Sequence, residues 1–245
     1  MTALAYTRYE LLRTFRNRRF FIFSLVFPLI LYFLIAGPNR NEHDLGGSGI
    51  GAPLYFMVGL AAFGTMNAVL AGGARIAAER SVGWNRQLRL TPLTPRAYFR
   101  AKVITSYLMA CSTIAVLYAA GASLGVGMPA GRWLHMTWML LLGLIPFVAL
   151  GIVFGHLLTS DSIGPVMGGT TALFAFLGGV WFPISSHGAL HVIAQTLPSY
   201  WLVQAARLGA GGPGWSGTGW GVMAAWTVVL VAVARQLYRR DTQRV

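Results

Sequence analysis

A block of positive charge interrupts a very apolar chain between Ala74 and Lys102. The block carries six arginines and one lysine against a single acid, Glu79, and long apolar runs flank it on both sides. A segment of this kind does not cross a bilayer, and it marks the cytoplasmic side. It is also more elaborate than a connection between two spans requires. We therefore expect it to form a docking surface for another protein.

Composition places the chain in a membrane. Of its 245 residues, 56% are hydrophobic and only 10% are charged, whereas about a quarter of the residues in a soluble domain are charged. The net charge of +13 does not indicate nucleic-acid binding, because most basic residues lie in short segments beside apolar runs, as the positive-inside rule expects. The single cysteine, Cys111, lies inside an apolar run and forms neither an intrachain disulfide nor a cysteine-based metal site.

The apolar runs predict an all-α integral membrane protein with six transmembrane helices. Sixteen of the 19 basic residues fall before the first run, between the second and third, or after the last. Both termini are therefore expected in the cytoplasm. The expected spans are Phe20–Ala36, Ala52–Ala71, Ile104–Leu124, Trp133–Leu158, Ile163–Phe182 and Gly217–Leu237.

Two segments outside these spans have helical patterns of their own. Residues 1–19 place Leu4, Leu11, Leu12 and Phe15 on one helical face, which predicts an interfacial helix on the inner leaflet; an ordinary basic flank of a span is the alternative. Residues 183–200 repeat apolar residues at helical spacing but are too short to span. We expect a short re-entrant helix that dips into the outer leaflet before the last span.

Small residues recur four apart in three spans, at Gly121 and Gly125, Gly151 and Gly155, and Gly164 and Gly168. Such spacing allows helices to approach closely, either within the chain or between two subunits, and the sequence leaves both open.

Motifs for chemistry are missing from the sequence. A P-loop needs a Gly-Lys pair, but Lys102 follows Ala101, so any ATP would be hydrolysed by another chain. We expect no catalytic residue and no metal site, since His187 and His191 fit the rim of an amphipathic helix better than a ligand pair. The predicted spans contain almost no ionisable residues, which argues against a proton-coupled carrier.

The order of these segments resembles the ABC-2 type permeases, the membrane subunits of bacterial ABC exporters, over essentially the whole chain. Glu79-Arg80-Ser81-Val82-Gly83, followed by Gln87-Leu88-Arg89-Leu90-Thr91-Pro92-Leu93, is similar to the family's "ER…G…L…TP" element between the second and third spans. Gly178-Gly179-Val180-Trp181-Phe182-Pro183 is similar to its outer re-entrant region. Trp84 departs from the pattern, because a small or polar residue is more usual after the glycine.

The resemblance implies one transmembrane domain over residues 1–245, with a coupling loop over 73–102 that docks on a separate ATP-binding subunit. ATP and Mg would lie on that partner, and no cofactor on this chain. A second permease chain, identical or related, would complete the transporter in the bacterial inner membrane. The expected coupling residues are Glu79, Arg80, Gly83, Arg89, Pro92 and Leu93.

The transport path would then lie between two permease chains. Few fixed charges in the spans favour a hydrophobic or amphipathic cargo. Efflux of a drug or antibiotic, and hence antibiotic resistance, is the first expectation; export of a lipid or glycolipid is the second. A carrier that works without ATP and a membrane anchor that only assembles other proteins are the alternatives. The residues expected to line the path are Met57, Phe63, Asn67, Phe174 and Phe176.

Overall fold

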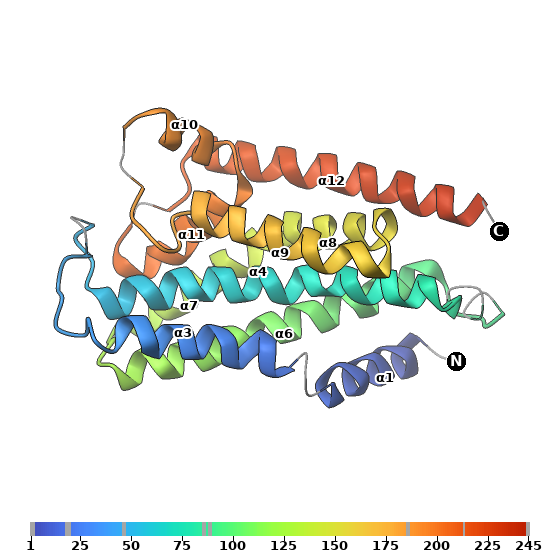
Figure 1. Ribbon diagram of the computed structural model, residues 1–245, viewed down its shortest axis with the longest axis horizontal. Coiled ribbons are helices and arrows are strands. Elements are labelled where there is room, and N and C mark those ends of the chain that lie inside the picture. Colours follow the sequence, from blue (N-terminus) through green and yellow to red (C-terminus); the bar gives the residue numbers. More distant parts are fainter. Residues whose placement is uncertain are drawn as a thin grey trace.

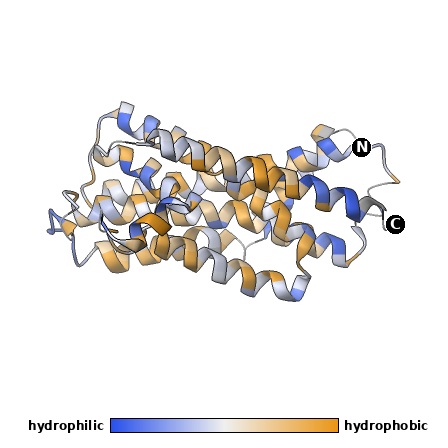
Figure 2. Cartoon of the chain, turned by 90° about the horizontal axis from the view of Figure 1, so that it is seen from above, coloured by the Kyte–Doolittle hydropathy of each residue, from blue (hydrophilic) through white to orange (hydrophobic). Residues whose placement is uncertain are grey.

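The chain folds into a bundle of helices that run roughly along one direction (Figure 1). Helix α1 (Ala3–Arg16) and the last turns of α12 (Gly217–Gln243) lie at the same end of the bundle, which we call the charged end. Figure 2 shows hydrophobic residues along the middle of the bundle and hydrophilic residues gathered toward its ends. The computed structural model describes residues 3–17, 21–45, 48–84, 87, 90–184, 187–212 and 214–243.

Helix α4 (Ala52–Ser81) forms the centre of the bundle. Eight of its 30 residues are Ala, a strong helix former, and a proline lies in its first turn, where the missing N–H costs nothing. Most of its residues are buried, whereas α12 is buried along only one face. The helices packed around α4 are α3 (Phe27–Ala36), α6 (Pro95–Ser123), α8 (Ile145–Leu157) and α9 (Ser160–Leu177).

Within the described ranges, four helices are long and apolar enough to cross a membrane. They are α4, α6, the continuous segment Ala130–Leu157, and α12. The multi-pass, all-helical class expected from the sequence is therefore confirmed. Helix α3 is shorter, follows a π-helical turn at Ile22–Val26, and lies beside α4, as does α9. The count of six spans stays a prediction.

Several helix boundaries differ from the predicted spans. Helix α4 continues ten residues beyond Ala71, and α6 begins at Pro95 rather than Ile104. Only residues 82–94 connect them, so most of the expected loop 73–102 is helical. Charged residues such as Arg and Glu are good helix formers. A helix can therefore continue beyond the end of an apolar run. The fourth predicted span is one continuous segment with a one-residue interruption at Leu144, between α7 (Ala130–Gly143) and α8, because Pro146 lacks an N–H.

Two short helices occupy the end of the bundle opposite the charged end, α10 (Ala189–Gln195) and α11 (Pro198–Arg207). Both are too short to span. Helix α10 lies within the expected re-entrant segment 183–200, most of α11 lies beyond it, and the dip into the outer leaflet stays a prediction. Arg207 donates hydrogen bonds to the Tyr55 hydroxyl and to the Gly179 carbonyl oxygen, each 3.0 Å long. The Tyr55 hydroxyl donates to the same carbonyl at 2.8 Å. These contacts join α11, the start of α4 and the end of α9.

Glycines let α4 and α8 pack backbone to backbone. A Cβ atom added at Gly73 would collide with the carbonyl oxygen of Gly151, and one at Gly155 would lie 2.8 Å from the Gly73 carbonyl oxygen. Of the three expected small pairs, Gly151 and Gly155 therefore serve packing within the chain. At Gly164 and Gly168, by contrast, an added Cβ would have open space beyond its own helix, as far as the described residues reach.

We expect Gly73→Ala to destabilise the protein by about 1–3 kcal/mol, because the added methyl group overpacks the α4–α8 contact. The measurement is thermal unfolding of the purified protein in detergent. Gly221→Ala is the matched control, since Gly221 lies inside α12 with open space around it, and it should be neutral or slightly stabilising. Equal melting temperatures for Gly73→Ala and wild type would contradict the packing described.

Candidate functional site

Glu79 is a buried acid near the end of α4 that accepts three charged or hydroxyl donors. The side chain is 1% exposed. Its Oε1 lies 2.6 Å from Lys102 Nζ and 2.8 Å from an Arg13 guanidinium nitrogen, and its Oε2 accepts a 2.7 Å hydrogen bond from the Tyr98 hydroxyl. Burying a carboxylate is costly unless it is paired and hydrogen-bonded. Here α1 and α6 supply the partners.

A second buried acid, Glu10 of α1, shares the same lysine. Lys102 Nζ lies 2.6 Å from Glu10 Oε1, and both side chains are almost fully buried. Thr14 donates to the Glu10 carbonyl oxygen, and Arg75 donates to the Thr14 hydroxyl. We call these interacting residues the ionic cluster: Tyr6, Glu10, Arg13, Thr14, Arg75, Glu79, Tyr98 and Lys102.

The spacing of α1 explains how it reaches the cluster. Tyr6, Glu10 and Thr14 are four residues apart, so they share one helical face, and all three are buried. Leu4 and Leu12 are 81% and 53% exposed on the other side. Helix α1 therefore turns a polar face toward the bundle and an apolar face outward, the reverse of a helix on a soluble protein.

Positive and negative side chains lie close together in the cluster. Three cations, Arg13, Arg75 and Lys102, surround two carboxylates. Burial lowers the pKa of Arg13, but the carboxylates of Glu79 and Glu10 outweigh it and raise that pKa overall. Burial also raises the pKa of Tyr6, and the same carboxylates raise it further. Tyr6 is therefore a neutral phenol that packs against the Tyr98 ring at 6.1 Å between centroids.

Arg80, the next residue along α4, belongs to a different set of contacts. Its guanidinium donates to the Gly155 carbonyl oxygen at 2.9 Å and lies 2.9 Å from Asp241 Oδ2. Adjacent residues of α4 thus bind different parts of the molecule: Glu79 holds α1 and α6, and Arg80 holds α8 and α12.

The segment that follows, 82–94, leaves the bundle. Gly83 has a positive φ of 69°, a conformation that glycine adopts readily. Val82 and Leu90 are 74% and 89% exposed. Leu93, in contrast, is partly buried beside a small apolar group that includes Ile76. The segment therefore has fixed roots, and the apolar side chains of Val82 and Leu90 are exposed. Of the residues expected to act here, Pro92 is exposed, and Arg89 lies outside the described residues.

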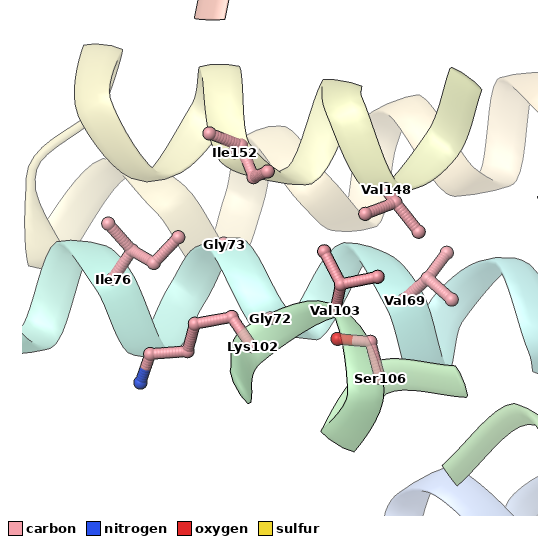
Figure 3. Close-up of a pocket in the computed structure, with 9 residues that line it drawn as sticks. All are labelled: Val69, Gly72, Gly73, Ile76, Lys102, Val103, Ser106, Val148 and Ile152. Carbon is pink, nitrogen blue, oxygen red and sulfur yellow. The ribbon is translucent and has the colours of Figure 1, made fainter. Parts of the chain in front are cut away.

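A shallow pocket lies beside the cluster, between α4, α6 and α8 (Figure 3). Its lining is mainly apolar, from Val69 and Ile76 to Val148 and Ile152. Figure 3 shows the Lys102 ammonium pointing away from Val148 and Ile152. The ammonium therefore serves the ionic cluster, and the pocket gains no charge from it.

A known family and a known protein are similar to this chain in sequence. Residues 39–235 match the family described as "ABC-2 family transporter protein". The chain belongs to the ABC-2 transporter family. It is also 28% identical to "Putative transport permease YvfS" of Bacillus subtilis (strain 168) over 195 residues, which are 78% of each chain. This ABC-2 protein is thus a multi-pass membrane subunit of an ABC transporter. Helix α1 and Asp241 lie outside the matched residues.

The residues expected to line a path in this ABC-2 chain do not share one environment. Met57 is fully buried beside Gly121, and Phe174 is 7% exposed, so both belong to the core of the chain. Phe63 and Asn67 are half-buried, one turn apart on α4, and the Asn67 amide donates to the Phe63 carbonyl oxygen. Phe176 is 56% exposed. All five stay predictions as residues of a transport path, and they lie apart from the ionic cluster.

Sequence reasoning missed most of the ionic cluster. It assigned Lys102 to a loop and gave no role to Glu10, Arg75 or Tyr98. The structure places all four in helices, with Arg75 half-buried and the other three buried. The polar stripe of Tyr6, Glu10 and Thr14 was the available signal, because a polar face on a helix at a membrane needs partners.

We expect Lys102→Met to destabilise this ABC-2 protein by about 3–5 kcal/mol, because two buried carboxylates lose their shared cation. Thermal unfolding in detergent measures the loss, and trypsin should cut α1 faster if the helix is released. Arg100→Gln on the same helix is the control, since Arg100 is exposed. If both variants unfolded at the wild-type temperature, the cluster would not stabilise the fold.

Proposed function

We propose that this chain is the permease subunit of an ABC exporter that moves a hydrophobic or amphipathic compound out of a bacterial cell. ATP would be bound and hydrolysed by a separate subunit. Membership of the ABC-2 family supports the proposal. One observation carries it. Glu79 and Lys102 hold the two helices from which the 82–94 segment extends, while Val82 and Leu90 of the segment itself are exposed.

Residues 82–94, which we call the docking segment, fit the role of a coupling element that docks on the ATP-binding subunit. Exposed Val82 and Leu90 offer apolar anchors, and the surrounding arginines offer charge-assisted hydrogen bonds to acidic residues of a partner. Because Glu79 of α4 binds Lys102 of α6, a force on the 82–94 segment would move both helices together. Helix α1 would follow through Glu10.

The charged end would then face the cytoplasm, with six spans crossing the inner membrane. This orientation follows the positive-inside rule. It also suits α1, whose outward apolar residues Leu4 and Leu12 would enter the inner leaflet beside the bundle, as an interfacial helix does.

The transport path would lie between two permease chains, identical or related. Gly164 and Gly168 leave the surface of α9 open to close approach by another helix. Phe63, Asn67 and Phe176 keep accessible surface on α4 and α9 and would line the path. A drug or antibiotic is the first cargo to test, and a lipid or glycolipid is the second.

The first experiment is to purify the tagged permease from its native membrane in mild detergent and to identify what accompanies it. A soluble protein with a P-loop, in about equal amount to the permease, would support the proposal. Transport by the permease alone, abolished by a protonophore, would overturn it in favour of a proton-coupled carrier. The observation that favours this second candidate, the proton-coupled carrier, is the buried Lys102 with its two carboxylates.

We expect Arg96→Glu to weaken binding of the ATP-binding subunit about tenfold, because a reversed charge beside the docking segment repels an acidic partner. Arg96 is exposed in the first turn of α6. The measurement is the dissociation constant of the purified subunits. Arg40→Glu is the matched control, an exposed arginine at the opposite end, and it should bind as wild type does. Equal weakening by both variants would contradict the placement of the interface.

A further inference from the structure

Asp241, in the last turns of α12, receives side chains from two other helices. Its Oδ2 lies 2.9 Å from Arg80 Nε and 2.8 Å from His156 Nδ1. Arg80 and Asp241 are 29% and 27% exposed, whereas His156 is almost fully buried. The guanidinium of Arg80 also donates to the Gly155 carbonyl oxygen. Arg80 and Asp241 therefore connect the ends of α4, α8 and α12.

Aromatic rings extend this contact to α6. The rings of Phe99 and Tyr238 lie 5.0 Å apart, and the His156 ring lies 6.1 Å from Phe99 and 5.8 Å from Tyr238. Phe99 stands in the second turn of α6, just after the docking segment, and Arg80 stands just before it. The end of α12 thus touches both roots of the 82–94 segment.

We infer that Asp241 is a positioning residue, which fixes the direction in which α4 delivers the docking segment to the ATP-binding subunit. A carboxylate that binds a guanidinium through two donors restricts its orientation more than a single contact does, and Arg80 Nη2 also reaches Asp241 Oδ1 at 3.4 Å. Without that carboxylate, Arg80 keeps only the Gly155 carbonyl among the partners described. The end of α12 is then a third part of the coupling apparatus, beside the segment itself and α1.

The inference rests on the proposed function for its effect on docking, but its structural part can be measured alone. Asp241→Asn keeps the shape and removes the charge. Asp161→Asn is the matched control, because Asp161 is an exposed acid in the first turn of α9, at the same end of the bundle. Asp241→Glu keeps a carboxylate and should restore the wild-type behaviour in part.

The first readout is amide hydrogen exchange of the purified permease over residues 76–84. We expect faster exchange there in Asp241→Asn alone, with an unchanged melting temperature. The second readout is the dissociation constant for the ATP-binding subunit recovered with the permease. We expect it to rise about twofold to fivefold in Asp241→Asn, as loss of a partly exposed ion pair implies, and to stay at the wild-type value in Asp161→Asn.

The outcomes separate this inference from the proposal on which it rests. Unchanged exchange in Asp241→Asn would overturn the positioning role. Faster exchange with wild-type affinity would overturn the contribution of α12 to docking. If the wild-type permease bound no ATP-binding subunit, the proposed function would fail and the docking effect with it.

Discussion

The ammonium of Lys102, placed between the carboxylates of Glu10 and Glu79, is the contact on which the charged end of the molecule depends. Each carboxylate lies 2.6 Å from it. A buried acid without a cation would protonate or unfold its surroundings, so α1 and the end of α4 would both be held less firmly without this lysine. One side chain on α6 thus helps to hold two other helices.

This dependence explains the unusual orientation of α1. A helix on a soluble protein turns its apolar stripe inward, but α1 turns Tyr6, Glu10 and Thr14 inward and leaves Leu4 and Leu12 exposed. Such a helix gains little from hydrophobic burial against the bundle. Ion pairs hold it there, and its apolar face remains available to lipid in the proposed membrane orientation.

The sequence predicted the fold class well and the site only partly. Apolar runs give the membrane helices directly, because each must contain enough apolar residues to cross a bilayer. They do not reveal that α4 continues to Ser81 or that the fourth span is interrupted at Leu144. The same limit applies to Gly151 and Gly155, since glycine spacing predicts close packing but not which helix is the partner.

The ionic cluster was harder to predict than the spans because its members are far apart in the sequence. The motif around Glu79 and Arg80 drew attention to the correct end of α4. Their partners come from Glu10, from Lys102 and from Asp241, however, and pairing across such separations depends on the tertiary arrangement. Polar residues that a span-by-span reading treats as flanks turn out to be the groups that join the helices.

Helix α4 runs without a break from Tyr55, whose hydroxyl binds the Gly179 carbonyl, to Glu79 and Arg80 at the charged end. With 30 residues, its length is about 45 Å at the usual rise of an α-helix. A rod of that length acts as a lever: tilting it by about 5° around its midpoint would displace each end by about 2 Å, in opposite directions. Because α4 and α8 pack backbone to backbone at Gly73 and Gly151, the two helices would tilt together as one rigid body. A small push on one side of the membrane could then be delivered to the other by geometry alone.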